Sequence, residues 1–192
     1  QRHLNDEFVI KSKVEGYRSR SSYKLIEIEK KFKVFHNCNY VLDLGCAPGG
    51  WLQVAKEFAP QNCTILGIDR LKIQEINDVR FIEKDIFDDD VIKVIENNLD
   101  NKIDLLMSDM SPNSSGNKSV DHLIIISLVE KVLDISKSIL KPNGILISKI
   151  FQGGAQGELI EQMKRNLNKI KYFKPKASRK ESPETYLIAK KN

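Results

Sequence analysis

A glycine-rich turn near residue 45 is the segment whose residue types point most directly to ligand binding. The apolar run Val41–Leu44 leads into Gly45-Cys46-Ala47-Pro48-Gly49-Gly50, after which a stretch of helical period begins. Glycines let the backbone approach a ligand closely and adopt dihedral angles that are closed to other residues. Doubly wound sheets bind nucleotides at this carboxyl edge of their strands, beside free N–H groups of a helix. The turn therefore indicates a nucleotide-type cofactor, with a purely structural tight turn as the alternative.

Two acidic residues strengthen the cofactor interpretation. Asp69 ends the second expected strand, where it could bind ribose hydroxyls, and Asp85 follows the third. A dinucleotide fold prefers the pattern G-x-G-x-x-G, but Ala47 stands at its third position, and the Gly-Lys-Ser/Thr of a P-loop is absent. An NAD-binding protein is therefore disfavoured, although calorimetry with NAD remains the direct test.

The elements that must position these residues alternate between β-type runs and longer segments of helical period, which is typical of a layered α/β sheet. We expect strands at Tyr40–Leu44, Thr64–Ile68, Val79–Ile82, Ile103–Ser108, Gly144–Ile150, Lys169–Phe173 and Thr185–Ala189. We expect helices after Ser21 or Ser22, at Gly49–Phe58, after a capping Asp88, at Asp121–Leu140 and at Gln156–Leu167, with a turn at Lys141–Gly144. No internal repeat or linker interrupts this pattern, so we expect one domain.

The composition restricts the remaining possibilities. A chain of 192 residues with 41% hydrophobic and 30% charged residues is typical of a folded globular protein. The three cysteines, Cys38, Cys46 and Cys63, show no C-x-x-C spacing, and the three histidines are scattered, so we expect neither a disulfide framework nor a metal site. Apolar runs such as Ile103–Met107 are too short to cross a membrane. The sequence starts at Gln1 rather than Met, so a cytoplasmic location and one in a mitochondrion or other organelle both fit.

Five segments together resemble the motifs of one enzyme family. They are Tyr17–Leu25, Asp43–Trp51, Met107–Asn113, Ser148–Gly153 and Ser182–Tyr186. In order and spacing they are similar to the FtsJ/RrmJ family of RNA 2′-O-ribose methyltransferases, from about Gly16 to the C-terminus. The departures are small: Cys46 and Leu52 stand where alanine and serine are common. The chain also lacks the Asn/Asp-Pro-Pro-aromatic segment of amino-group methyltransferases and the Pro-Cys dipeptide of base C5 methyltransferases.

The resemblance implies a fold and a cofactor. The fold would be a Rossmann-like, doubly wound seven-stranded α/β sheet with the last strand antiparallel, formed by residues 1–192 as a single methyltransferase domain. A basic segment and helix in residues 1–35 would flank the sheet. The cofactor would be S-adenosyl-L-methionine. Its binding residues would be Asp43, Gly45, Cys46, Ala47, Pro48, Gly49, Gly50, Trp51, Asp69, Asp85, Ile86 and Asp109.

The family's Lys-Asp-Lys-Glu tetrad falls by motif on Lys24, Asp109, Lys149 and Glu184. A ribose 2′-hydroxyl is hardly ionised at neutral pH, whereas a sulfonium methyl is already electrophilic, so such an enzyme mainly needs alignment and proton removal. Our hypothesis makes Lys149 the base or hydroxyl-orienting group and Asp109 its orienting partner, with Lys24 and Glu184 steering the ribose and the lysine charge states. A lone lysine or glutamate is usually a solvated surface charge, so the joint pattern carries this assignment.

The charge distribution bears on the substrate. The formal net charge is +5, and from Lys164 onward ten Lys and Arg residues face two Asp and Glu residues. With Lys11, Lys13, Arg18 and Arg20 they could form a phosphate-binding rim, on which Tyr17, Tyr23 or Phe151 could stack a base. The resemblance favours a uridine of large-subunit ribosomal RNA as the substrate. We expect the protein to act as a monomer and to have no membrane partner. A transfer-RNA or mRNA-cap 2′-O-methyltransferase and a non-catalytic ribosome-assembly factor are the alternatives.

Overall fold

The computed structural model describes residues 6–112, 115–151 and 158–192. Parts of the segments discussed above lie outside these ranges, namely Gln1, Asn113, Gln152, Gly153 and the expected helix start at Gln156. The helices are α1 Glu7–Glu15, α2 Ser22–Phe32, α3 Gly50–Phe58, α4 Val91–Asn98, α5 Lys118–Ile139 and α6 Glu158–Asn166. The strands are β1 Tyr40–Leu44, β2 Thr64–Asp69, β3 Val79–Glu83, β4 Ile103–Ser108, β5 Leu140–Phe151, β6 Leu167–Phe173 and β7 Glu184–Lys191.

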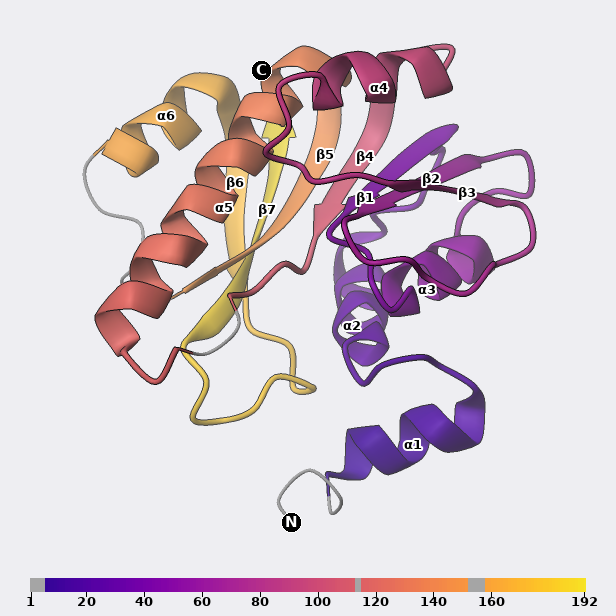
Figure 1. Cartoon of the computed structure of the whole chain (residues 1–192), viewed down its shortest axis with the longest axis vertical. Coiled ribbons are helices and arrows are strands. Elements are labelled where there is room, and N and C mark those ends of the chain that lie inside the picture. Colours follow the sequence, from indigo (N-terminus) through magenta and orange to yellow (C-terminus); the bar gives the residue numbers. More distant parts are fainter. Residues whose placement is uncertain (1–5, 113–114, 152–157) are drawn as a thin grey trace.

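The strands form one seven-stranded sheet in the order β3-β2-β1-β4-β5-β7-β6 (Figure 1). Strand β7 is antiparallel to both of its neighbours, β5 and β6, whereas β1 to β5 pair in parallel. The expected doubly wound seven-stranded α/β sheet with an antiparallel last strand is confirmed.

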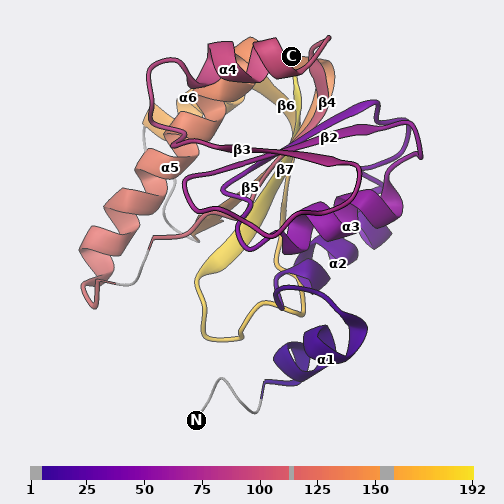
Figure 2. The same ribbon diagram turned by 45° about the vertical axis from the view of Figure 1, so that its right-hand side comes forward.

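Helices cover both faces of this sheet. On one face α2 and α3 bury Leu25, Ile28 and Trp51 against strand residues such as Met107. On the other, α4, α5 and α6 pack on a second cluster of buried side chains. Figure 1 and Figure 2 place α5 and α6 across the sheet from α2 and α3. Because both faces are covered, the central strands are apolar almost throughout, as in β4, where every residue is buried.

The chain connections change direction between β1 and β4. The connection from β1 leads outward to β2 and β3, whereas that from β4 leads the other way to β5. Strands β1 and β4 are hydrogen-bonded neighbours, with Leu44 opposite Ser108 at their carboxyl ends. Such a topological switch point opens a crevice beyond the strand ends, which is where open α/β sheets bind ligands. The glycine turn and Asp109 both follow directly at this point.

Helix α1 is an element that the sequence pattern did not reveal. Its apolar residues do not line one face, so its ends define it instead. The Asp6 side chain accepts a hydrogen bond from the N–H of Phe8 at the N-terminus, and Gly16 ends the helix with φ 77°. Phe8 packs on Tyr23 of α2, with ring centroids 5.4 Å apart.

Two expected element boundaries on the α4 and β5 side were wrong. The residue before α4 is Asp90, and Asp88 instead forms an ion pair with Lys84 at 3.1 Å. The expected turn at residues 141–144 is a bulge within β5. Leu140 pairs with Ile103 and Ile145 pairs with Leu105, so β5 advances by five residues while β4 advances by two. The ion pair of Lys141 with the buried Asp104 holds this bulge against β4.

The start of helix α5 also differs from expectation, whereas α2 begins where expected but without the expected cap. Helix α5 begins three residues before Asp121, because the Asn117 side chain accepts hydrogen bonds from the N–H groups of Ser119 and Val120. Ser21 does precede α2, but its hydroxyl hydrogen-bonds to that of Ser19 and does not cap the helix.

Candidate active site

Two hollows lie near the carboxyl ends of the strands, and they share no lining residue. The first is lined by Ser19, Ser21, Asp43, Gly45, Cys46, Ala47, Pro48, Gly50, Trp51 and Asp109. The second, with a volume of about 420 Å³, is lined by Arg20, Lys24, Arg179, Glu181, Ser182 and Glu184. The first therefore contains most of the expected cofactor residues, and the second contains half of the expected tetrad.

Backbone hydrogen bonds to the neighbouring strand β2 hold the glycine turn in place. The N–H groups of Gly45 and Cys46 both donate to the carbonyl of Ile68, at 2.8 and 3.2 Å. Gly45 has φ 71°, and a Cβ atom there would lie 2.0 Å from Cγ of Met110. Gly49, with φ 105°, precedes the first residue of α3. The sequence thus supplies glycine where the backbone is left-handed and where a side chain would find no room.

Asp43 is the most unusual group in the first hollow. Its side chain is buried, with the residue 1% exposed, and within the described part of the chain Oδ2 has no hydrogen-bond partner. Burial raises the pKa of this carboxyl well above its ordinary range, and the neighbouring Asp109 and Asp69 raise it further. An unpartnered buried carboxylate beside two others favours a ligand that brings positive charge into this hollow.

The other expected cofactor residues lie at the same edge of the sheet. The Asp69 carboxylate accepts hydrogen bonds from the N–H groups of Ala47 and Leu71, both at 2.8 Å, and so holds the glycine turn. Asp69 pairs with Glu83 in β3, which places Asp85 beside it just past the strand end. The side chain of Ile86 is buried and belongs to the core cluster on the α4 and α5 face of the sheet. Gly49, Asp69, Asp85 and Ile86 do not line the hollow itself.

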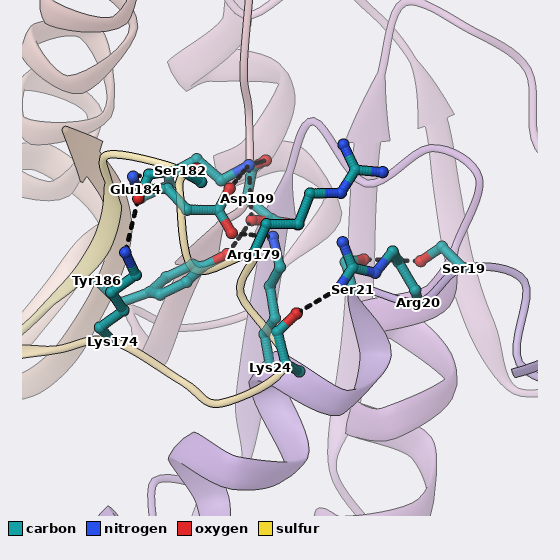
Figure 3. A network of polar contacts seen from close by, with 12 residues as sticks. Ser19, Arg20, Ser21, Lys24, Asp109, Lys174, Arg179, Ser182, Glu184 and Tyr186 are labelled. Carbon is teal, nitrogen blue, oxygen red and sulfur yellow. Dashed lines mark hydrogen bonds and ion pairs between the residues drawn. The ribbon is translucent and has the colours of Figure 1, made fainter. Parts of the chain in front are cut away.

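The four residues of the expected tetrad come together. Nζ of Lys24 lies 2.6 Å from Oε1 of Glu184, and Nζ of Lys149 lies 3.9 Å from Oε2 of the same carboxylate. Lys149 also lies 2.9 Å from Oδ1 of Asp109 and donates to the carbonyl of Asp109 at 2.8 Å. Figure 3 shows Lys24, Asp109 and Glu184 converging from α2, the loop after β4 and the start of β7. Two cations and two anions thus form one connected cluster.

Burial and charge act in opposite directions on the two carboxylates. Burial favours the neutral acid of Asp109, but the ammonium groups of Lys149 and Lys24 outweigh it and lower the pKa below its ordinary 3.8. Burial is also the largest influence on Glu184, yet Lys24 and Lys149 again outweigh it and lower the pKa below 4.5. Both carboxylates are therefore ionised at neutral pH and balance the charge of the lysines.

Tyr186 is a site residue that sequence reasoning missed. Its fully buried hydroxyl donates a hydrogen bond to Oδ1 of Asp109. Burial raises the pKa of this hydroxyl well above its ordinary value, as do Asp109 and Glu184, so it remains a donor. A signal was present: residues 184 and 186 lie two apart on a strand, and Tyr186 pairs with Lys149 in β5, so their side chains share one face of the sheet.

The expected phosphate rim is only partly supported by the side chains near the N-terminus. Arg18 donates to three backbone carbonyls. Arg20 donates to the carbonyl of Ala177 at 2.6 Å, and its Nη1 lies 3.3 Å from Oδ2 of Asp6. Tyr23 is buried, 5% exposed, so it cannot stack on a base. Within this group only Arg20 lines the second hollow.

The strand order, the ligand crevice at the switch point and the cluster beside it define a Rossmann-like methyltransferase. The chain belongs to the FtsJ-like methyltransferase family, whose model matches residues 17–192. It is therefore an enzyme that needs a methyl donor. Among the residues that the structure describes, no helix combines the length and apolarity needed to cross a membrane.

Similar proteins agree with this family. The chain is 44% identical over 194 residues to the ribosomal RNA large subunit methyltransferase E of Rickettsia felis, with 98% of this chain and 86% of the relative covered. The protein of the same name from Rickettsia rickettsii (strain Sheila Smith) gives the same values. A crystal structure described as a putative ribosomal RNA methyltransferase from Plasmodium falciparum is 31% identical, with a TM-score of 0.77 over 91% of this chain and 98% of that one. A putative hemolysin from Lactococcus lactis, 16% identical with a TM-score of 0.63 over 91% and 88% of the two chains, shares the fold alone.

Proposed function

We propose that this enzyme transfers a methyl group from S-adenosyl-L-methionine to a ribose 2′-hydroxyl of RNA, and that its substrate is a uridine of large-subunit ribosomal RNA. The observation that carries the proposal is the convergence of Lys24, Asp109, Lys149 and Glu184 beside the glycine-turn hollow. The names of the Rickettsia relatives support the choice of ribosomal RNA. We further propose that it acts as a monomer, in the cytoplasm or in an organelle that assembles ribosomes.

The first hollow suits this cofactor chemically. S-adenosylmethionine carries an ammonium and a sulfonium, and when bound it supplies an electrophilic methyl group. Asp43, buried and lacking a partner for Oδ2 among the described residues, provides the negative charge that such a ligand needs. The turn from Gly45 to Trp51 would surround it, while Asp69 and Asp85 at the adjoining strand ends would accept hydrogen bonds from ribose hydroxyls.

Lys149 is the group that we assign to the acceptor hydroxyl. It is 6% exposed and is held by both the carboxylate and the carbonyl of Asp109, so its ammonium group has one fixed position. Lys24 and Glu184 lie on the second hollow, where a ribose can enter. To take up the hydroxyl proton Lys149 must present a free electron pair at Nζ, and the contacts with Asp109 hold that atom in place.

The charged lining of the second hollow fits the RNA side of the reaction. Arg20, Arg179 and Ser182 line this hollow together with Lys24 and Glu184. The loop that carries Arg179 is anchored to α2, because the Glu27 carboxylate accepts hydrogen bonds from the N–H groups of Lys176 and Ala177. Guanidinium groups bind phosphates in a defined geometry, so this wall can orient a nucleotide whose ribose points at Lys149.

The test is transfer of a labelled methyl group from S-adenosylmethionine to isolated large ribosomal subunits, free ribosomal RNA and transfer RNA, followed by nucleoside mapping. We expect label in a 2′-O-methyluridine of the large-subunit RNA. Label confined to transfer RNA would show that transfer RNA, and not ribosomal RNA, is the substrate. Label on a base would overturn the assignment of the ribose as the methyl acceptor. Binding of the subunit without any transfer would favour the assembly-factor alternative.

A further inference from the structure

Arg18 connects the glycine turn, which lines the first hollow, with the loop that follows Asp69. Nη1 donates to the carbonyls of Pro48, at 3.2 Å, and Gln74, at 2.7 Å, and Nη2 donates to that of Glu75 at 2.9 Å. Pro48 belongs to the glycine turn, whereas Gln74 and Glu75 lie in the loop that follows Asp69. A Cβ atom at Gly49 would lie 2.7 Å from Nη1, so the guanidinium rests directly on the turn.

The backbone around Arg18 is itself fixed to α3. Its N–H donates to Oε1 of Gln53 at 2.8 Å, and Nε2 of Gln53 donates back to the carbonyl of Gly16 at 2.9 Å. Three residues further on, Nε1 of Trp51 donates to the carbonyl of Ser21 at 3.0 Å. The segment is therefore attached to the helix after the glycine turn on both sides of Arg18, and its guanidinium cannot drift away from the turn.

These contacts differ from those of an RNA-binding arginine. A guanidinium has five N–H donors in a rigid fork, and here it makes three hydrogen bonds to backbone carbonyls, one in the glycine turn and two in the loop that follows Asp69. Arg18 lines neither the first nor the second hollow. Arg20, two residues away, is the arginine that lines the second.

We propose that Arg18 is a positioning residue for the methyl donor: it holds the glycine turn and the loop after Asp69 at the spacing that the cofactor requires. This inference rests on the proposed function, because it takes S-adenosylmethionine as the ligand. It assigns to Arg18 a structural task toward the cofactor in place of the phosphate contact that its position in a basic segment predicts.

The experiment compares Arg18→Gln and Arg18→Lys with the wild-type enzyme. Calorimetry gives the Kd for S-adenosylmethionine, filter binding gives the Kd for the RNA, and initial rates give KM for each substrate. We expect Arg18→Gln to raise Kd and KM for the cofactor about tenfold, the effect of one lost charge-assisted hydrogen bond, with the RNA Kd nearly unchanged. Arg18→Lys keeps the charge but cannot reach three carbonyls at once, so it should resemble Arg18→Gln.

Lys56→Gln is the matched control. It also removes one positive charge and one attachment of the loop after β2, since Lys56 forms an exposed ion pair with Asp78 at 2.8 Å. Exposed pairs of this kind contribute little, so both Kd values should stay as in the wild type. An Arg18→Gln enzyme with normal cofactor affinity but weakened RNA binding, restored by Arg18→Lys, would overturn the inference and leave the proposed function standing. Failure of the wild-type enzyme to bind the cofactor would instead refute the proposed function.

Discussion

The hydroxyl of Tyr186 donates to Oδ1 of Asp109, the same oxygen that lies 2.9 Å from Nζ of Lys149. One carboxylate oxygen therefore receives both a neutral and a charged donor. Tyr186 is fully buried and pairs directly with Lys149 across β5 and β7, so the sheet fixes the position of both groups. The lysine is thus held by a carboxylate that is itself held by the tyrosine.

Replacement of Tyr186 by phenylalanine tests this arrangement. The ring remains, but Asp109 loses a hydrogen bond that lowers its pKa. We expect kcat to fall about tenfold and the free energy of unfolding to fall by about 1–2 kcal/mol, with the KM for the methyl donor nearly unchanged. Tyr172→Phe is the control, since Tyr172 is 58% exposed on the neighbouring strand β6. Equal rates for the two variants would show that Tyr186 only fills space.

Lys149→Ala tests the assignment of the acceptor-side base. Removal of the ammonium leaves Asp109 and Glu184 with one cation fewer between them, but Lys149 itself does not line the first hollow. We expect single-turnover methyl transfer to slow about 100-fold or more, while calorimetry shows cofactor binding and filter binding shows RNA binding. Lys164→Ala, which removes an exposed lysine of α6 that is 64% accessible, should keep full turnover. Full turnover by Lys149→Ala with both ligands bound would refute the assignment.

Much of the fold could be predicted because its signals are local. The strand β1 has the bounds that its apolar run predicts, and β4 likewise, since buried parallel strands show near-continuous apolar runs. Helix α1 could not be predicted, because its ends at Asp6 and Gly16 define it and it has no continuous apolar face. The bulge at the start of β5 was not predicted either, because it depends on the register of β5 against β4 and lies at an ion pair between Lys141 and Asp104, which are far apart in the sequence.

The candidate site shows the same limit. The convergence of Lys24, Asp109 and Glu184 was expected from motif order, and the structure brings them together. The contacts of Arg18 could not be predicted, because a basic residue in a basic segment carries no sign that backbone carbonyls surround it. Polar partners that are distant in sequence are set by tertiary packing, which residue types and spacing do not encode locally.

Gly45→Ala tests the fit of the glycine turn, with Gly16→Ala as the control. Both glycines have positive φ, 71° and 77°, so each alanine pays about 1–2 kcal/mol for a left-handed backbone. Only at Gly45 does the new Cβ meet another group, Cγ of Met110 at 2.0 Å, whereas nothing lies within 4 Å at Gly16. We expect a larger loss of unfolding free energy at Gly45, by about 1–3 kcal/mol, together with loss of cofactor binding. Chemical denaturation and calorimetry measure both, and equal effects of the two substitutions would contradict the close approach.

Asp43→Asn should have opposite effects on stability and on cofactor binding, and its effect on stability should depend on pH. Burial, Asp109 and Asp69 raise the pKa of Asp43 in the folded state above its ordinary 3.8, so the folded protein holds this proton more tightly than the unfolded chain does. The free energy of unfolding of the wild-type protein therefore decreases as pH rises from about 3.8. Asparagine does not ionise, so the Asp43→Asn protein does not show this decrease.

We expect the cofactor-free Asp43→Asn protein to unfold at higher denaturant concentration than wild type at neutral pH, with the difference shrinking as pH falls toward 3.8. The same variant should bind S-adenosylmethionine more weakly, because the neutral side chain no longer offers negative charge to the ligand. Asp134→Asn, on a side chain that is 59% exposed on α5, controls for loss of one charge and should change neither quantity. A destabilised Asp43→Asn protein at neutral pH would show that the carboxylate has a stabilising partner in the folded state, and an unchanged cofactor Kd would remove Asp43 from the binding site.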